Sequence, residues 1–442
     1  MTLPQSFIDR TKLILKDEYP EFENALNSVA PTSIRYNDKF KYIVDNELVK
    51  WCSNAFYLNE RPLFTADPLF HAGAYYVQEA SSMFLYNAVN QHFKNAEKVL
   101  DLCAAPGGKS TLLAQTLLEN CILVSNEIVR SRAYILAENL SKWGNPNTIV
   151  SNNQASDFSD LKYFFDAVVI DAPCSGEGMF RKDAGSISEW SLDNVYRCAE
   201  RQKEIVNDVW NALKPGGILI YSTCTYNREE NEENVAWICQ ELGAEFLKID
   251  LEGNNEIVES DLGYRFYPHR TKGEGFFISV LRKNTEEYSK KIKKTELKKS
   301  IKFFDSKEFP YKLKTDRNWT YLNDNNFIRA YDADNFNDFM LLIQHFNCIE
   351  SGILQGEIKG KDFIPATQLA LSKAFDIESA QSVELDYKTA ISFLKKETIS
   401  LPNEPLGFLL VKYKNLPLGW VKNIGNRCNN LYPQNWRIRM NL

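Results

Sequence analysis

Val99-Leu-Asp-Leu-Cys-Ala-Ala-Pro-Gly-Gly-Lys-Ser110 runs from an apolar strand into a glycine turn and then into a helix. Small residues in such a turn let the backbone approach a ligand, and the first turn of the helix offers free N–H groups. A Walker A phosphate loop is excluded because it requires glycine five positions before Gly108, where Cys103 stands. A dinucleotide fingerprint fails too, since the stretch lacks GxGxxG. The stretch therefore predicts either a turn without a ligand or a nucleoside-type site on an open α/β sheet.

Short apolar runs alternate with longer amphipathic runs on both sides of this stretch. The apolar runs predict strands at 98–102, 121–126, 148–151, 167–171, 217–223 and 275–281. The amphipathic runs predict helices at 111–118, 131–143 and 195–213. This alternation is typical of βαβ units, so we expect an α/β fold with a mostly parallel sheet and helices on both faces.

Composition changes along the 442 residues suggest several domains, at roughly 100–200 residues per domain. We expect a small N-terminal α+β domain at 1–90, the α/β domain at 91–283, a lysine-rich linker at 284–305 and a β-rich region at 306–442. The segment Tyr288–Lys302 holds seven lysines and one glutamate. It is compatible with a solvated linker or with a nucleic-acid contact.

Bulk composition limits the class of protein. The chain is 44% hydrophobic and 25% charged, which is ordinary for a globular protein and excludes a disordered or fibrous one. It has no apolar run long enough for a transmembrane helix and no secretory signal at its start, so we expect a cytoplasmic protein without a membrane partner. Nine cysteines without CxxC pairs predict reduced thiols and no metal site. The net charge of −6 means that any basic surface for nucleic acid must be local.

Two further motifs place a cysteine at the end of a predicted strand, in Asp171-Ala-Pro-Cys174 and Ser222-Thr-Cys224. The carboxyl ends of strands line the ligand crevice of an open α/β sheet, so these cysteines and Asp171 should converge beside the glycine turn. Glu127 ends the second strand about 20 residues after that turn, where an acidic side chain binds ribose hydroxyls. A buried, inert thiol is the alternative for each cysteine.

A thiolate beside a nucleoside-type ligand suggests chemistry on a pyrimidine. Carbon 5 of a pyrimidine is a poor nucleophile, and thiolate addition at carbon 6 turns it into an enamine-like carbon that can attack a methyl donor. A carboxylic acid near N3 would relieve the charge that develops on the ring. The second cysteine could then help the adduct to collapse.

The motifs closely resemble those of the S-adenosylmethionine-dependent RNA cytosine-C5 methyltransferases of the NOL1/NOP2/Sun family, and within it the bacterial 16S rRNA enzymes of the RsmF type. The resemblance covers nearly the whole chain. The matching segments are 73–82, 101–109, 171–178, 222–225, 265–269 and 273–277. It implies a Rossmann-like class I methyltransferase domain, with S-adenosyl-L-methionine as the cofactor.

The resemblance also implies roles for individual residues. Cys224 would be the nucleophile, Cys174 would assist product release, and Asp171 would contact the target base and close the methionine side of the cofactor site. Glu127 would hold the ribose, and Gln154 stands where the family usually has an aspartate that reaches the adenine amine; glutamine can still accept that hydrogen bond, without charge. Lys109 would be an active-site contact or only a structural helix residue. The cofactor would be wrapped by Cys103, Ala104, Ala105, Pro106, Gly107, Gly108 and Lys109.

The resemblance further implies an N-terminal domain that positions RNA and a PUA-like, RNA-binding C-terminal region. Strands are expected at 407–413, 418–422 and 435–439, where Arg437 and Arg439 would share one face. Trp420 and Trp436 could stack on bases or simply fill the core. We also expect a chain that ends at about residue 300 to keep cofactor binding and to lose RNA affinity.

The implied substrate is a cytosine of 16S rRNA within a small-subunit particle, bound by a monomeric enzyme. The alternatives are a tRNA cytosine-C5 methyltransferase, or a non-catalytic RNA-binding ribosome assembly factor on the same fold. A non-catalytic protein should have lost Cys224 or the segment 103–109, and the sequence retains both.

Overall fold

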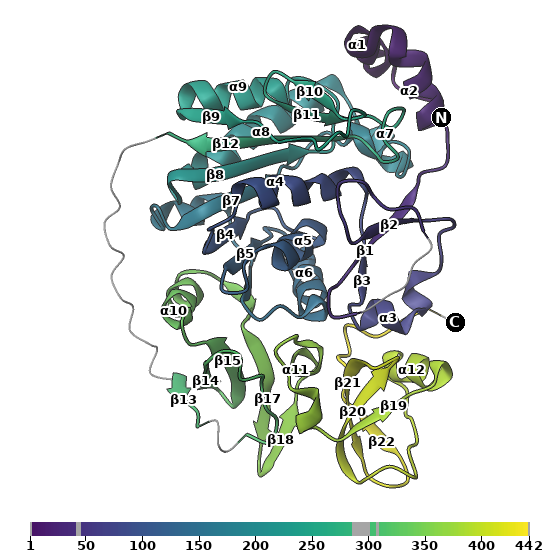
Figure 1. Ribbon diagram of the computed structural model, residues 1–442, viewed down its shortest axis with the longest axis vertical. Helices are drawn as coiled ribbons and strands as arrows, with labels where there is room; N and C mark the ends of the chain where they lie inside the picture. Colours follow the sequence, from purple (N-terminus) through teal and green to yellow (C-terminus); the bar gives the residue numbers. More distant parts are fainter. Residues whose placement is uncertain (1, 41–45, 285–300, 306–308, 441–442) are drawn as a thin grey trace.

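A ten-stranded sheet forms the centre of the molecule in the computed structural model, which describes residues 2–40, 46–284, 301–305 and 309–440 (Figure 1). Five of its strands are parallel and lie side by side in the order β8-β7-β4-β5-β6. They are β4 (Lys98–Asp101), β5 (Ile122–Asn126), β6 (Thr148–Ser151), β7 (Phe165–Asp171) and β8 (Leu213–Thr223). The chain adds β5 and β6 on one side of β4 and then adds β7 and β8 on the other side. Open α/β sheets bind ligands at the point where the strand order changes in this way, here between β4 and β7.

Antiparallel strands extend the sheet at both edges. On one side β12 (Phe276–Lys283) pairs with β8 and carries β9 (Ala244–Leu247) and β11 (Gly263–Phe266), and β11 pairs with β10 (Val258–Ser260). On the other side β16 (Cys348–Ser351) pairs with β6. A strand from the region predicted as a separate unit at 306–442 therefore completes the central sheet, while the division into domains stays a prediction.

Helices cover both faces of the sheet, as the alternating pattern predicts. Two clusters of buried side chains lie on opposite faces. One is closed by α4 (Leu85–His92), α5 (Gly108–Thr116) and α6 (Arg130–Trp143), and the other by α8 (Leu192–Trp210), α9 (Glu232–Glu241) and α10 (Phe336–His345). The α/β prediction is confirmed.

The N-terminal segment contributes two helices and a small sheet. The sheet has the order β2-β1-β3, formed by β1 (Thr32–Tyr36), β2 (Ala55–Leu58) and β3 (Tyr75–Val77), with α3 (Pro68–His71) beside it. The helices α1 (Gln5–Leu15) and α2 (Tyr19–Leu26) share a buried cluster with Phe180, Trp190 and Tyr226, near α7 (Ala184–Glu189). The first helices thus cover the loops that follow β7 and β8.

The C-terminal region holds two further sheets, which Figure 1 shows in green and yellow. The first has the order β13-β14-β15-β17-β18: β13 (Ile301–Phe303), β14 (Trp319–Asp324), β15 (Phe327–Asp332), β17 (Ile353–Lys359) and β18 (Asp362–Pro365), followed by α11 (Thr367–Leu371). The second has the order β19-β20-β21-β22: β19 (Ser382–Glu384), β20 (Gly407–Tyr413), β21 (Leu416–Asn423) and β22 (Cys428–Asn430), with α12 (Tyr387–Leu394). Most of the lysine-rich segment lies outside the described residues.

The predicted strand at 435–439 is wrong. A turn lies there, because the Trp436 N–H donates to Pro433 and the Ile438 N–H donates to the Leu394 carbonyl at the end of α12. Trp436 and Ile438 are nevertheless buried, so the apolar alternation reflects packing of an irregular segment. Trp420 is fully buried as well, and its Nε1 donates to the Ala366 carbonyl at 2.9 Å. Both tryptophans belong to the core.

The two ends of the chain share one hydrophobic core. Ile34, Ala72 and Tyr75 from the N-terminal segment pack in the same cluster as Phe393 and Trp436 from the C-terminal region. Figure 1 shows α3 beside the C-terminal sheet. Within the described ranges, the helices are too short or too polar for any of them to span a bilayer.

Candidate active site

Four predicted site residues meet where β7 and β8 end. The Lys109 Nζ lies 2.8 Å from the Asp171 Oδ2, and the Ser222 Oγ donates to the other oxygen of Asp171 at 3.0 Å. The sulfur atoms of Cys174 and Cys224 are 3.0 Å apart. The sheet brings these groups together because β7 and β8 are parallel neighbours, with Asp171 in register with Ser222.

Two members of this cluster, Lys109 and Cys174, have raised pKa values. Burial acts to lower the pKa of Lys109, but the neighbouring Asp171 carboxylate outweighs it and leaves that pKa above its ordinary value. The hydrogen bond with Cys224 and then burial raise the pKa of the Cys174 thiol well above its usual range. Cys174 therefore keeps its proton at neutral pH, and its sulfur shares a hydrogen bond with the Cys224 sulfur.

The glycine turn 103–109 follows β4, and we refer to it as the cradle. Gly107 has a φ of +114°, which favours glycine, and it provides no side-chain cap for the N–H groups that begin α5. Beneath the turn, the Asp101 Oδ2 accepts a hydrogen bond from the Ser110 Oγ at 2.6 Å, while its Oδ1 is buried and has no partner among the described residues. Free N–H groups and an unmatched buried oxygen fit a polar ligand such as a nucleoside.

Glu127 lies after β5, as predicted, and is almost completely buried. One of its oxygens accepts from the Val129 N–H at 2.8 Å, and the other lies 3.3 Å from the Arg132 guanidinium. Arg132 also donates to the Ala105 carbonyl at 2.8 Å, so the carboxylate is tied to the glycine turn. Its contact with a ribose stays a prediction.

Gln154 is exposed at the same edge of the sheet, and its backbone N–H donates to Asp157 at 2.9 Å. Sequence reasoning missed Asn126, whose amide donates to Leu102 and Asn153 carbonyls at 3.2 and 3.0 Å. This side chain joins the turn after β4 to the segment that follows β6. Its position at the end of a predicted strand is the sequence feature that could have identified it.

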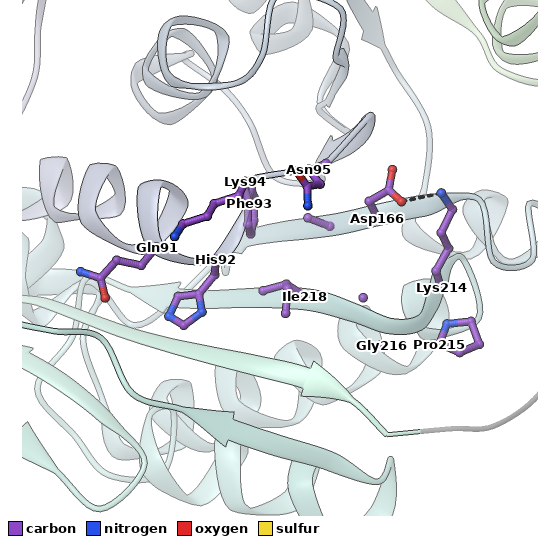
Figure 2. Close-up of a pocket in the computed structure, with 13 residues that line it drawn as sticks. Gln91, His92, Phe93, Lys94, Asn95, Asp166, Lys214, Pro215, Gly216 and Ile218 are labelled. Carbon is purple, nitrogen blue, oxygen red and sulfur yellow. Dashed lines mark hydrogen bonds and ion pairs between the residues drawn. The ribbon is translucent and has the colours of Figure 1, made fainter.

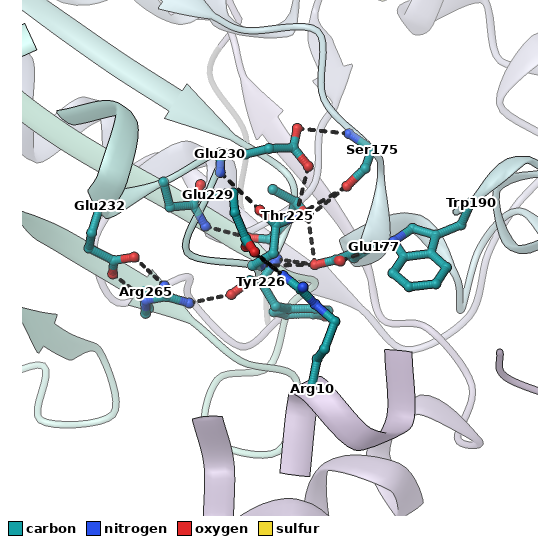
Figure 3. A network of polar contacts seen from close by, with 12 residues as sticks. Arg10, Ser175, Glu177, Trp190, Thr225, Tyr226, Glu229, Glu230, Glu232 and Arg265 are labelled. Carbon is teal, nitrogen blue, oxygen red and sulfur yellow. Dashed lines mark hydrogen bonds and ion pairs between the residues drawn. The ribbon is translucent and has the colours of Figure 1, made fainter. Parts of the chain in front are cut away.

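Two buried glutamates, Glu177 and Glu230, were also missed although Glu177 lies inside the matching segment 171–178. Figure 3 shows them between the loop after β7 and the loop after β8. The Glu177 Oε2 accepts from the Thr225 hydroxyl and from the backbone N–H groups of Tyr226 and Asn227, at 2.6, 2.7 and 2.9 Å. The Glu230 Oε2 accepts from the Ser175 N–H at 3.0 Å.

A separate hollow of about 310 Å³ lies at the other end of the parallel strands, away from the predicted site residues (Figure 2). It is lined by residues 91–96, 166–167 and 214–218, at the amino ends of β4, β7 and β8. None of the predicted site residues lines it. In the described part of the chain, no group of three His, Cys, Asp or Glu side chains is arranged to hold a metal ion.

Three family profiles match the chain in sequence order. Residues 3–80 match the profile of the N-terminal domain of 16S rRNA methyltransferase RsmF, and residues 88–282 match that of the 16S rRNA methyltransferases RsmB/F. Residues 380–438 match the profile of the methyltransferase RsmF PUA domain. The matches cover the N-terminal segment, most of the central sheet and the last sheet.

Curated relatives and solved structures agree with these profiles. The chain is 30% identical over 473 residues to the ribosomal RNA small subunit methyltransferase F of Vibrio cholerae, and the alignment covers 98% of this chain and 97% of that protein. It is 34% identical over 304 residues to the protein of the same name from Pectobacterium atrosepticum, an alignment that covers 64% of this chain and 63% of that protein. The solved structure of a methyltransferase homolog protein from Pyrococcus horikoshii is 28% identical, with a TM-score of 0.55, and the match covers 63% of this chain and 95% of that one.

Proposed function

Because the chain belongs to the family of ribosomal RNA small subunit methyltransferase F, we propose that it transfers a methyl group from S-adenosylmethionine to carbon 5 of a cytosine in 16S rRNA, through a covalent adduct with Cys224. The observation that carries the proposed roles is the pair of sulfur atoms 3.0 Å apart, beside the Asp171–Lys109 ion pair. A mechanism with a single catalytic thiol would not require a second thiol at that distance.

The cradle after β4 would hold S-adenosylmethionine, because its open N–H groups and the buried oxygen of Asp101 fit a polar nucleoside. Segment 103–109 would wrap the cofactor, Glu127 would bind its ribose, and Gln154 would face its adenine. When bound, this cofactor supplies an electrophilic methyl group to carbon 5 of the cytosine. The residues of the chain bind the base and activate it.

Cys224 begins the reaction on the base. Its thiol releases a proton to solvent, the thiolate forms a bond to carbon 6, and the electrons of the C5–C6 double bond move onto carbon 5 and toward N3. Asp171 contacts the base, and the Lys109 ammonium at 2.8 Å from that carboxylate offsets the negative charge that reaches the ring. The Lys109 ammonium thus stabilises the adduct that makes carbon 5 nucleophilic, while Asp171 holds the ammonium and orients the base.

Cys174 completes the reaction after carbon 5 carries the methyl group. The hydrogen bond to Cys224 is the largest cause of the raised pKa of Cys174, and that cause disappears when the Cys224 sulfur is bonded to carbon 6. Cys174 can then lose its proton to solvent and take the proton from carbon 5. The electrons of that C–H bond form the C5–C6 double bond and expel the Cys224 thiolate.

The C-terminal sheet would capture RNA, supported by the match of residues 380–438 to the RsmF PUA domain. We propose that segment 1–90 positions the substrate, that 91–283 is the catalytic domain, and that 284–305 links it to the RNA-binding region at 306–442. The substrate would be a small-subunit particle, bound by a monomer in the cytoplasm. Because a paired base cannot reach Cys224, the cytosine would be flipped or taken from a loop.

The two cysteines can be separated by the adducts that they leave. Cys174→Ala should stop the reaction after methyl transfer, so denaturing gels of this variant with 16S rRNA and S-adenosylmethionine should show a slow, nuclease-sensitive protein band. Cys224→Ala should abolish methylation and show no such band, and the double variant should match it. Cys239→Ala on α9 is the control for loss of a half-buried thiol and should behave as the unmodified protein does.

Opposite outcomes would contradict the assignment in different ways. A slow band in Cys224→Ala but not in Cys174→Ala would reverse the two roles. Methylation by both single variants without any band would remove covalent catalysis from this chain. Methylation of tRNA but not of 16S rRNA by the unmodified protein would overturn the substrate.

A further inference from the structure

We propose that Glu177 and Glu230 are positioning residues that hold Cys174 against Cys224, and that this carboxylate pair sets the rate at which the methylated base is released. The inference rests on the proposed function and deepens it. Neither carboxylate is assigned to the base or to the cofactor. Their role would be to keep the Cys174 sulfur within reach of the carbon-5 proton, which can be removed once Cys224 has attacked carbon 6 and carbon 5 has been methylated.

The carboxylate pair joins the two cysteine loops reciprocally (Figure 3). Glu177 belongs to the loop that carries Cys174, yet its Oε2 accepts three hydrogen bonds from residues 225–227, directly after Cys224. Glu230 lies beyond Cys224, yet its Oε2 accepts from the N–H of Ser175, directly after Cys174. Each loop therefore supplies the acceptor for the other.

Both carboxylates are also hydrogen-bonded to side chains outside the two loops. The Glu177 Oε1 accepts from the Trp190 Nε1 at 3.0 Å, just before α8. Glu230 accepts from the Gln202 Nε2 on α8 at 2.7 Å, and Gln202 in turn accepts from the Tyr221 hydroxyl on β8 at 2.8 Å. These hydrogen bonds therefore fix the two loops relative to the central sheet and to α8, which covers it.

The charges of this pair are not explained by ion pairing. Within the described ranges, no lysine or arginine forms an ion pair with Glu177 or Glu230, although the neighbouring Glu229 pairs with Arg10 and Glu232 pairs with Arg265. Glu177 is 2% exposed and Glu230 is fully buried. Burying a carboxylate without a cation costs free energy, which the hydrogen bonds that it accepts must offset. We therefore infer the role of the pair from the donors that these hydrogen bonds hold in place.

Cys174 is the thiol that depends more on the carboxylate pair. Cys224 directly follows β8, whereas Cys174 lies three residues beyond the end of β7. The backbone of its loop reaches the β8 segment through the N–H groups of Ala172 and Gly178, and between them Ser175 is held by Glu230. Weakening the pair should therefore displace Cys174 first, which slows removal of the carbon-5 proton and leaves attack by Cys224 intact.

Glu177→Gln offers a test with an internal rescue. If the amide oxygen keeps the three donors at 225–227, the amide nitrogen faces the Trp190 Nε1–H, and two donors then oppose each other. We expect kcat to fall about tenfold, because the buried Trp190 donor loses its acceptor, with KM for RNA and cofactor unchanged. Covalent protein–RNA adduct should accumulate on denaturing gels. Trp190→Phe removes the opposing donor, so the double variant should regain most of kcat.

Separate measurements distinguish positioning from simple loss of stability. RNA with 5-fluorocytosine at the target cannot lose fluorine as a cation, so it reports attack by Cys224 without release. Glu177→Gln and Glu230→Gln should trap this RNA at the rate of the unmodified protein. Glu229→Gln, a carboxylate of the same loop outside the pair, is the matched control for both assays, and thermal unfolding monitors the fold of every variant.

The possible failures point to different claims. If the unmodified protein neither methylates RNA nor traps the fluorinated base, the proposed function is wrong. If it does both, and Glu177→Gln and Glu230→Gln match Glu229→Gln in kcat and adduct level, the positioning role is overturned. Equal slowing of 5-fluorocytosine trapping and of turnover would also overturn it, because the pair would then act on Cys224 or on the fold as a whole.

Discussion

Asp101 is a fully buried carboxyl at the end of β4, and the fold favours its neutral form. Burial raises its pKa to about 7, with further effects from the Ser110 hydroxyl, Asp171, Lys109 and Glu127 around it. A carboxyl whose pKa is raised on folding makes the folded protein bind more protons than the unfolded chain does. Stability from this group is therefore present at low pH and is lost as the pH rises through the interval from about 4 to 7.

We expect Asp101→Asn, which imitates the neutral carboxyl, to remove this pH dependence. Without cofactor, its thermal midpoint should gain relative to the unmodified protein between pH 5 and pH 8, values that bracket the raised pKa of about 7. Calorimetric unfolding of both proteins across that range measures the difference. Parallel pH profiles for the two proteins would contradict the buried neutral state.

The residues that could be predicted were those inside contiguous motifs. Cys174, Cys224, Asp171 and Lys109 each follow a strand or begin a helix, so strand order alone brings them together, and their catalytic roles stay proposals. Glu177 and Glu230 could not be found in this way. Their partners are backbone N–H groups of another loop, and no sequence pattern marks a backbone donor that two folded loops leave inside.

At the scale of elements, Arg35 connects the N-terminal sheet to the cradle that we propose as the cofactor site. From β1 its guanidinium donates to the Gly108 carbonyl, the Thr111 hydroxyl and the Gln115 amide of α5, at 3.2, 2.7 and 2.6 Å. It also lies 4.6 Å from the centre of the Trp143 ring on α6. No carboxylate forms an ion pair with it in the described part of the chain, so neutral acceptors stabilise its charge.

Arg35→Met should loosen the junction between β1 and α5. The buried acceptors would lose their donors, which we expect to cost at least about 2 kcal/mol of unfolding free energy. Cofactor affinity should fall too, since Gly108 begins the helix below the cradle. Chemical denaturation and titration calorimetry test the two effects, with the exposed Arg61→Met as the control; no change in either would contradict the connection.

Periodicity predicted the elements that lie inside repeated βαβ units, and it failed where tertiary contacts replace a neighbouring strand. Residues 435–439 alternate in burial as a strand would, but their backbone bonds to a turn and to the end of α12. The edge strand β16 was missed because it pairs with a strand that is distant in the sequence. Its partner β6 lies almost 200 residues earlier, at residues 148–151, and nothing local marks a strand that leaves one region to pair with another.

The whole molecule is more continuous than its composition indicates. Phe346 packs against Phe158 with 4.3 Å between ring centres and an angle of 34° between the ring planes, on the face of the sheet that α8 covers. The Lys373 N–H donates to the Gly144 carbonyl at the end of α6, at 2.9 Å. Together with β16 and the shared core of Tyr75 and Trp436, these contacts make the C-terminal region part of the support of the proposed cofactor site.

We therefore expect a chain that ends at residue 300 to be compromised as a whole, in contrast to the expectation from sequence that it would keep cofactor binding. It would expose the edge of β6 and the apolar faces that residues 331–346 and 369–438 cover. Its thermal midpoint should fall well below that of the full chain, and cofactor affinity should fall with it. Gel filtration, thermal unfolding and calorimetry of both chains measure this.

Arg437→Gln combined with Arg439→Gln in the full chain is the matched variant, because both arginines are exposed while their neighbours Trp436 and Ile438 are buried. Its thermal midpoint and cofactor affinity should equal those of the unmodified protein. If the two arginines contact phosphates, the slope of log affinity for RNA against log salt should shrink by about 1.4 for single-stranded RNA. A shortened chain that stays monomeric, unfolds at the same temperature and binds the cofactor equally well would show instead that β16 and the shared core only rest against a self-sufficient domain.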